Sequence, residues 1–212
     1  MGQVLELPKR HRRAPNAENG KVVPPRPRPN KELGTREYLT PTEAERLIAA
    51  AGASGRYKGC DQTLLLLMYR HGLRVSEAVS LLWNQADPKA GILHIRRLKS
   101  GVPSTHSLRG PDLRALRELR RDWPDSPYLF VTERGGPMTS SNVRKLVTRA
   151  GQAAGLPFPA HPHMLRHACG FKLANDGHDT RALQHYLGHK NITHTVRYTE
   201  MAPDRFRTFW RD

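Results

Sequence analysis

Long apolar runs are missing from this sequence. The longest covers residues 64–69 and reads LLLLMY, far short of the roughly 20 residues that a membrane-spanning helix needs. The first residues also lack the apolar stretch that a signal peptide carries. We therefore expect a cytoplasmic protein, associated with the nucleoid if it binds DNA, and no membrane partner.

Cysteine is scarce as well, with only Cys60 and Cys169 among the 212 residues. In a reducing compartment we expect both to be free thiols. The sequence has no glycine-rich phosphate loop of either common type. These absences disfavour a small disulfide-stapled protein and an enzyme that uses nucleotides.

Acidic residues are few relative to basic ones. The chain has 35 lysines and arginines against 19 aspartates and glutamates, a formal net charge of +16. Such an excess favours a polyanionic partner, first nucleic acid and second an anionic membrane surface. Residues 1–37 hold nine of the basic residues and six prolines. They have too little apolar surface to offset the entropy of ordering, so we expect a disordered basic arm there and one folded domain over 38–212.

Helix signals dominate the folded part. Thr40, Pro41 and Glu43 form a capping box that opens a helix to about residue 51. Apolar spacing and breakers predict further helices over 61–71, from 75 to beyond 82, from 113, and over 140–150, 161–175, 180–187, 192–198 and 203–210. Strands are expected at 92–96, 104–108 and 128–131, the first two joined as a hairpin. The fold class is therefore mainly α with a small antiparallel sheet, an α+β architecture.

One segment of the sequence carries residues suited to phosphoryl chemistry. His163 and Arg166 lie three residues apart at a predicted helix start and share one face. Arginine presents a planar fork of donors to a phosphate, and histidine can exchange a proton near neutral pH. The pairs His163/His167 and His185/His189 have the i, i+4 spacing of a zinc site, which makes a metalloenzyme an alternative. Arg166 on the same face would repel a dication, and no carboxylate stands at ligand spacing, so we expect no metal.

Five motifs in order complete the pattern. They are GLRVSE over 72–77 with Arg74, Lys99 at the hairpin turn, His163-x-x-Arg166-His167, Leu187-Gly-His189, and Tyr198 nine residues after His189. Together they resemble the tyrosine site-specific recombinases, the lambda-integrase type, over residues 38–212. Within that family the chain is most similar to the small bacterial inversion recombinases that switch fimbrial promoters, which lack a separate N-terminal core-binding domain.

The resemblance implies the catalytic-domain fold of that family and a role for each motif residue. Tyr198 would attack the scissile phosphorus and form a 3′-phosphotyrosyl link that keeps the bond energy, so neither ATP nor a metal cofactor would be needed. Arg74 and Arg166 would hold the non-bridging oxygens, with Glu77 supporting Arg74. Lys99 would protonate the leaving 5′-oxygen. His163 would accept the tyrosine proton or hold the phosphate, and His189 would donate to the phosphate.

The same resemblance implies partners. The substrate would be double-stranded DNA, with four protomers assembled on two sites, and an accessory DNA-bending protein is a further expected partner. Arg144, Lys145 and Arg149 are candidates for DNA contact, and Phe206, Phe209 and Trp210 could dock on a neighbouring subunit. Two alternatives stay open: a catalytically inert DNA-binding regulator with this fold, and a monomeric type IB topoisomerase-like strand passer.

Overall fold

The computed structural model describes residues 17–18, 21–22, 37–53, 55, 57–97 and 101–200. It divides into two compact units, residues 1–35 and 36–212. In the first unit β1 (Ala17–Glu18) pairs antiparallel with β2 (Lys21–Val22). The rest of the predicted arm and the predicted helix over 203–210 lie outside the described residues. Everything below concerns the second unit.

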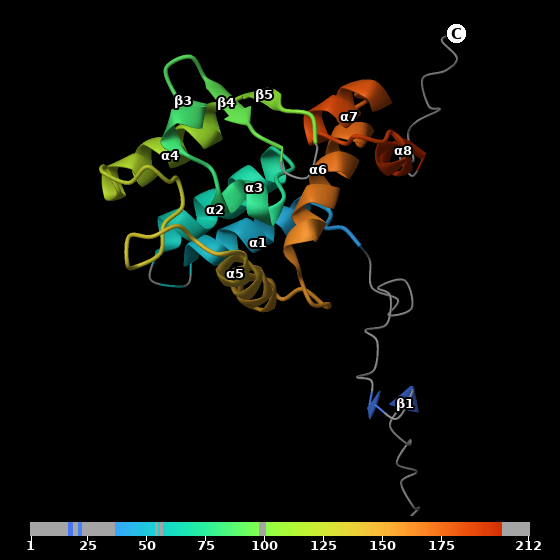
Figure 1. Cartoon of the computed structure of the whole chain (residues 1–212), viewed down its shortest axis with the longest axis horizontal. Helices are drawn as coiled ribbons and strands as arrows, with labels where there is room; N and C mark the ends of the chain where they lie inside the picture. The colour runs from blue at the N-terminus through green and yellow to red at the C-terminus, as the bar shows by residue number, and fades with distance from the viewer. Residues whose placement is uncertain are drawn as a thin grey trace, which may run out of the picture. The chain divides into compact units, whose positions relative to one another are not determined.

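The first half of this unit is a group of helices around one apolar core (Figure 1). The capping box predicted at its start is confirmed, because the Glu43 carboxylate accepts a hydrogen bond from the Thr40 backbone at 2.8 Å and Glu43 N donates to Thr40 Oγ1. The helices are α1 (Pro41–Ala53), α2 (Lys58–Arg70), α3 (Val75–Val79) and α4 (Gly110–Asp122). α3 is shorter than predicted. It ends at Val79, and Leu82 instead forms a bridge with Tyr128.

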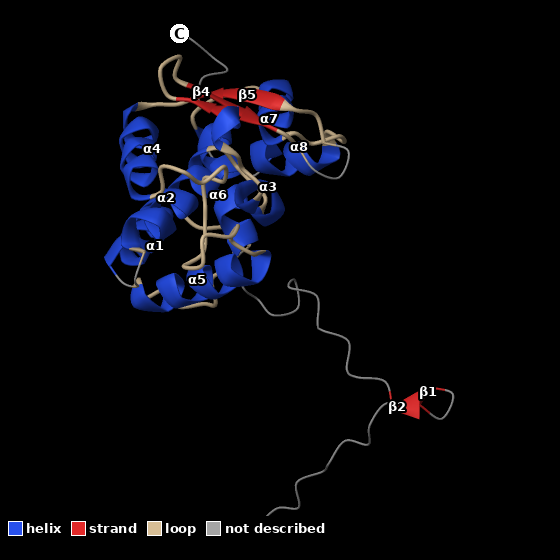
Figure 2. Ribbon diagram, turned by 60° about the vertical axis from the view of Figure 1, so that its left-hand side comes forward, coloured by secondary structure: helices blue, strands red, loops and turns tan. Residues whose placement is uncertain are grey.

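A three-stranded antiparallel sheet lies at one end of the helices, opposite α5 (Ser140–Ala153), as Figure 2 shows. The predicted hairpin is confirmed as β4 (Ile92–Ile95) and β5 (Ser104–Ser107), with Ile92 opposite Ser107. A short third strand, β3 (Ala86–Asp87), follows a 3₁₀ turn at Trp83–Gln85 and pairs with β4. The strand predicted at 128–131 is wrong. Tyr128 and Val131 form isolated bridges to different partners, so no continuous ladder develops.

The second half supplies the helices that carry most of the motif residues. They are α6 (Pro162–Asn175), α7 (Thr180–Leu187) and α8 (Thr193–Glu200). α6 packs against α2 on one side and against α7 and α8 on the other. α6 is buried almost all round, which brings its Arg166 into the interior. The prediction of a mainly α fold with a small antiparallel sheet is confirmed.

Candidate active site

Arg74 enters the site from the tight turn between α2 and α3. Gly72 has φ +58°, and a Cβ there would lie 2.5 Å from Leu187 Cδ2, so only glycine lets this turn pack against the end of α7. Arg74 is the N-cap of α3. Glu77 accepts hydrogen bonds from its backbone nitrogen at 2.9 Å and from its Nη1 at 2.7 Å. The expected support of Arg74 by Glu77 is confirmed, and Arg74 keeps about a third of its side chain open to solvent, at 30%.

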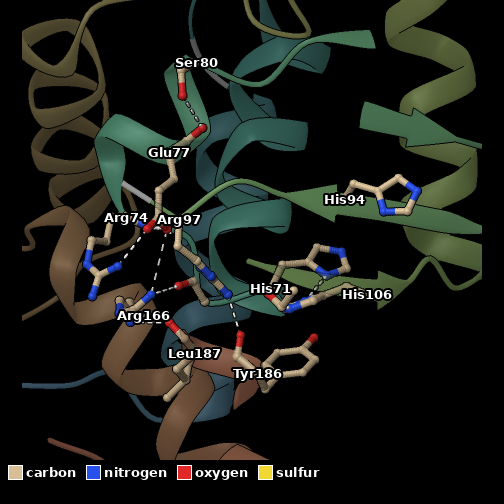
Figure 3. Close-up of polar contacts among 12 residues, drawn as sticks. His71, Arg74, Glu77, Ser80, His94, Arg97, His106, Arg166, Tyr186 and Leu187 are labelled. Atoms are coloured by element: carbon tan, nitrogen blue, oxygen red, sulfur yellow. Dashed lines mark hydrogen bonds and ion pairs between the residues drawn. The ribbon is translucent and has the colours of Figure 1, made fainter. Parts of the chain in front are cut away.

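Arg166 lies beneath Arg74 with 1% of its surface exposed. It donates from Nη1 to the Gly72 carbonyl and from Nη2 to the Leu187 carbonyl at 2.6 Å, and so ties the first motif to the end of α7. Burial, followed by the positive charge of Arg74, lowers the pKa of Arg166 to about 10. The guanidinium therefore remains cationic at neutral pH. Figure 3 shows both arginines around the Glu77 carboxylate.

His189 follows α7 at the edge of an open pocket. Gly188 takes the left-handed conformation, φ +64°, which ends the helix and turns the chain toward the two arginines. His189 Nδ1 lies 2.8 Å from Thr195 Oγ1, a contact that orients the ring. The pocket has a volume of about 730 Å³, and its lining includes Arg74, His189 and Lys190. This concave, positively charged surface suits a phosphate.

Tyr198 is buried in α8, with 1% of its surface exposed. Its hydroxyl lies 2.8 Å from Nδ1 of His167, and its ring packs edge-on against Phe171 and directly on Gly170. Burial raises the pKa of Tyr198 to about 12, even though Arg166 acts in the opposite direction. A base must therefore take the proton before this hydroxyl can act as a nucleophile at neutral pH.

The histidine that contacts Tyr198 is one to which sequence reasoning gave no chemical role. His167 holds the hydroxyl, whereas His163 is exposed and packs its ring against that of His167, with centroids 4.3 Å apart. Desolvation followed by neighbouring positive charge lowers the pKa of His167 to about 3 and that of His163 to about 4. Both rings are neutral at pH 7 and can accept a proton. The sequence signals for His167 were its place directly after Arg166 in the motif and its i, i+4 spacing from His163, which puts both rings on one helix face.

Five of the six residues predicted for catalysis are described, and they fall into two adjoining groups. Arg74 and His189 line the pocket, and Arg166 is buried beside them on the Gly72 and Leu187 carbonyls, while His163 reaches Tyr198 through His167. The rings of His189 and Tyr198 connect the groups, with centroids 6.3 Å apart. Lys99 lies outside the described residues. Within the described part, no three histidine, cysteine, aspartate or glutamate side chains are arranged to hold a metal ion.

Buried neutral histidines predict that acid destabilises the protein. His71, His106, His167 and His189 are all at least nine-tenths buried, and burial lowers the pKa of each, to about 3 for His167 and His189. In the unfolded chain these rings take up protons near pH 6.5. Between pH 6.5 and about 4 the unfolded state therefore binds more protons, and stability is lost as the pH falls.

We expect the free energy of unfolding, measured with urea, to be lower at pH 5 than at pH 7 by about 1 to 2 kcal/mol for each such histidine. Replacing His106 by glutamine should reduce this pH dependence, whereas the same change at exposed His178 should leave it intact. A free energy of unfolding that stays level from pH 7 to pH 5 would contradict the buried neutral rings.

A helical domain that gathers paired arginines, several histidines and a buried tyrosine near one open, basic pocket has the side chains that phosphoryl transfer needs. The sequence profile of the Phage integrase family matches residues 37–205. The chain belongs to this family.

Curated relatives cover most of the chain. The type 1 fimbriae regulatory proteins FimE and FimB of Escherichia coli K12 are 40% and 41% identical, over 84% and 82% of this chain and 92% and 90% of their own. The tyrosine recombinase XerC of Bacillus subtilis is 32% identical over 84% of this chain and 62% of its own. The XerA recombinase structure superposes with a TM-score of 0.70 at 27% identity, covering 84% of this chain and 66% of that one.

The protein is therefore a site-specific DNA recombinase that breaks and rejoins DNA, and DNA is its partner. A structure of XerH bound to its difH substrate shares the fold, with a TM-score of 0.69 at 23% identity. Among the described helices, none has the length and apolar character to cross a membrane.

Proposed function

We propose that Tyr198 is the nucleophile and that the two groups of side chains act together on one scissile phosphate. The Tyr198 oxygen bonds to phosphorus while the bond from phosphorus to the 5′-oxygen breaks, which leaves a 3′-phosphotyrosyl link and a free 5′-hydroxyl. The 5′-hydroxyl of a second strand reverses this step and releases the tyrosine. The observation that carries the proposal is the 2.8 Å contact between the Tyr198 hydroxyl and a neutral histidine, next to paired arginines.

In this scheme the tyrosine proton passes to His167. The ring is neutral at pH 7, lies within hydrogen-bond distance of the hydroxyl and contacts His163, which is open to solvent. His163 then holds the phosphate or takes the proton onward. Because Tyr198 is buried, α8 must move when DNA binds so that the hydroxyl reaches phosphorus.

Arg74 and Arg166 stabilise the charge that develops on the phosphorus oxygens, and His189 donates a third hydrogen bond. One preorganised donor of this kind is worth on the order of 10² to 10³ in rate. Lys99 protonates the leaving 5′-oxygen. The described residues on either side of Lys99 in the chain support this role. Arg97 hydrogen-bonds Glu77 and Gly101 lines the pocket, so this part of the chain runs next to the site.

The protein acts in the cytoplasm as a tetramer on two DNA sites. The arm over 1–37 adds positive charge that binds DNA independently of sequence, and an accessory protein bends the DNA. Two relatives are named regulatory proteins. The most direct way for a recombinase to regulate a gene is to invert a DNA segment that controls its transcription and lies between inverted repeats. We therefore propose inversion as the outcome of exchange.

The test uses the full chain and a supercoiled plasmid carrying the DNA that borders its gene, with chelator present and ATP absent. Sequencing of the products should show the segment between two short inverted repeats reversed. Tight, sequence-selective binding with no cleavage of nicked duplexes would point instead to an inert regulator. Loss of supercoils without new junctions would point to a topoisomerase-like enzyme.

A further inference from the structure

A third arginine shares the Glu77 carboxylate with Arg74 and Arg166. Arg97 follows β4, and its side chain is fully buried. Its Nη1 donates to Glu77 Oε2 at 2.9 Å, and its Nη2 donates to the Tyr186 carbonyl at the end of α7 (Figure 3). The sequence motifs gave Arg97 no role. Its burial removes it from any direct contact with DNA.

Two glycines make the space that Arg97 occupies. A Cβ at Gly188 would lie 2.6 Å from Arg97 Cγ, and a Cβ at Gly101 would lie 2.6 Å from Arg97 Cβ. Both distances are too short for real atoms, so any larger residue would displace the arginine. Gly188 directly precedes His189, and Gly101 lines the pocket. Arg97 therefore joins the hairpin, the first motif and the turn that carries His189.

Glu77 is the one carboxylate that these guanidinium groups share. Its Oε1 lies 2.7 Å from Arg74 Nη1, and its Oε2 lies 2.9 Å from Arg97 Nη1 but 3.9 Å from Arg166 Nη1. Although burial alone would raise the pKa of Glu77, Arg97 and then Arg74 hold it below its usual range. Glu77 is thus ionised, and its hydrogen bonds go to Arg74 and Arg97 rather than to Arg166.

We propose that Arg97 is a positioning residue for strand cleavage: by binding Glu77 Oε2 it keeps this carboxylate off Arg166, whose charge is then left for the scissile phosphate. Through the Tyr186 carbonyl it also fixes the turn that carries His189. The inference rests on the proposed role of Arg166 as a phosphate clamp. Without Arg97, Glu77 Oε2 loses a charged partner, and the Arg166 Nη1 that lies 3.9 Å away is a buried cation that this carboxylate would draw in.

The test measures strand cleavage of a nicked duplex by the full chain at saturating DNA, alongside DNA affinity. Arg97→Met should slow cleavage by about 100-fold, with affinity within about twofold since Arg97 does not reach DNA. Arg97→Lys keeps a charged donor for Glu77, so its cleavage rate should lie between those of the wild type and Arg97→Met. Arg46→Met is the matched control because Arg46 is an exposed arginine of α1 that also donates to backbone carbonyls, those of Ala154 and Gly155, and it should cleave at the wild-type rate.

The decisive variant combines Arg97→Met with Glu77→Gln. Removing the carboxylate frees Arg166 again, so the double variant should cleave at least about tenfold faster than Arg97→Met alone, a rescue that a purely structural role does not produce. Arg97→Met cleavage within threefold of wild type, or a double variant no faster than Arg97→Met, overturns the inference. If Arg166→Met also cleaves normally, the proposed function itself has failed; if Arg166→Met is inactive, only the role of Arg97 has failed.

Discussion

Replacing Tyr198 by phenylalanine will abolish the covalent DNA complex. The change removes only the hydroxyl, the group that forms the bond to phosphorus, and loss of a nucleophile costs at least about 10⁴-fold in rate. The ring keeps its packing on Gly170 and Phe171, so the folded state loses one hydrogen bond to His167, worth about 0.5 to 1.5 kcal/mol. The measurement is the fraction of nicked duplex that migrates with protein on a denaturing gel.

The matched control is Tyr57→Phe, a half-buried tyrosine that packs on Trp123 and belongs to none of the motifs. It should form the complex at the wild-type rate. DNA affinity should be equal within about twofold in both variants, since neither change removes a charge. A covalent band that persists in Tyr198→Phe would show that another residue attacks the phosphate.

Replacing Arg166 by methionine will slow cleavage by about 10² to 10³-fold, because a preorganised cationic donor at the phosphate is lost. It will also destabilise the fold. The Gly72 and Leu187 carbonyls each lose their buried donor, at about 1 to 3 kcal/mol each. Arg166→Lys keeps the charge but cannot serve both carbonyls and a phosphate, so its cleavage rate should stay well below wild type.

Circular dichroism first shows that each variant is folded. Cleavage rates at saturating DNA then report the loss of phosphate stabilisation separately from the loss of folding stability. A duplex with a neutral methylphosphonate at the scissile position offers a second comparison. It carries less charge for Arg166 to stabilise, so the ratio of wild-type to Arg166→Met rates should shrink on it. An Arg166→Met rate within threefold of wild type on the ordinary duplex would remove Arg166 from the phosphate site.

Local signals explain why much of the fold was predictable. The capping box at Thr40 and Glu43 and the hairpin of β4 and β5 depend on residues close in sequence. The predicted strand over 128–131 failed for the opposite reason. Apolar residues favour a strand, but Tyr128 and Val131 each find only a single distant partner, at Leu82 and Pro137.

The site residues also divide into those that sequence motifs predict and those that depend on long-range packing. Motif order and spacing pointed to Arg74, Arg166, His189 and Tyr198, and the structure brings these residues into two adjoining groups. Neither the contact from His167 to Tyr198 nor the burial of Arg97 follows from spacing. The first depends on how α8 packs on α6. The second depends on Gly188, which is far from Arg97 in the chain and leaves the space that the arginine fills.

The most direct test of the central claim is to identify the residue that carries DNA. Wild-type protein is trapped on a nicked duplex, digested with nuclease and protease, and the peptides are analysed by mass spectrometry. We predict a nucleotide phosphate on Tyr198, in the peptide that follows Arg197, with no metal or ATP in the reaction. An adduct on any other residue, or tight binding of a cleavable site with no adduct at all, would contradict the mechanism.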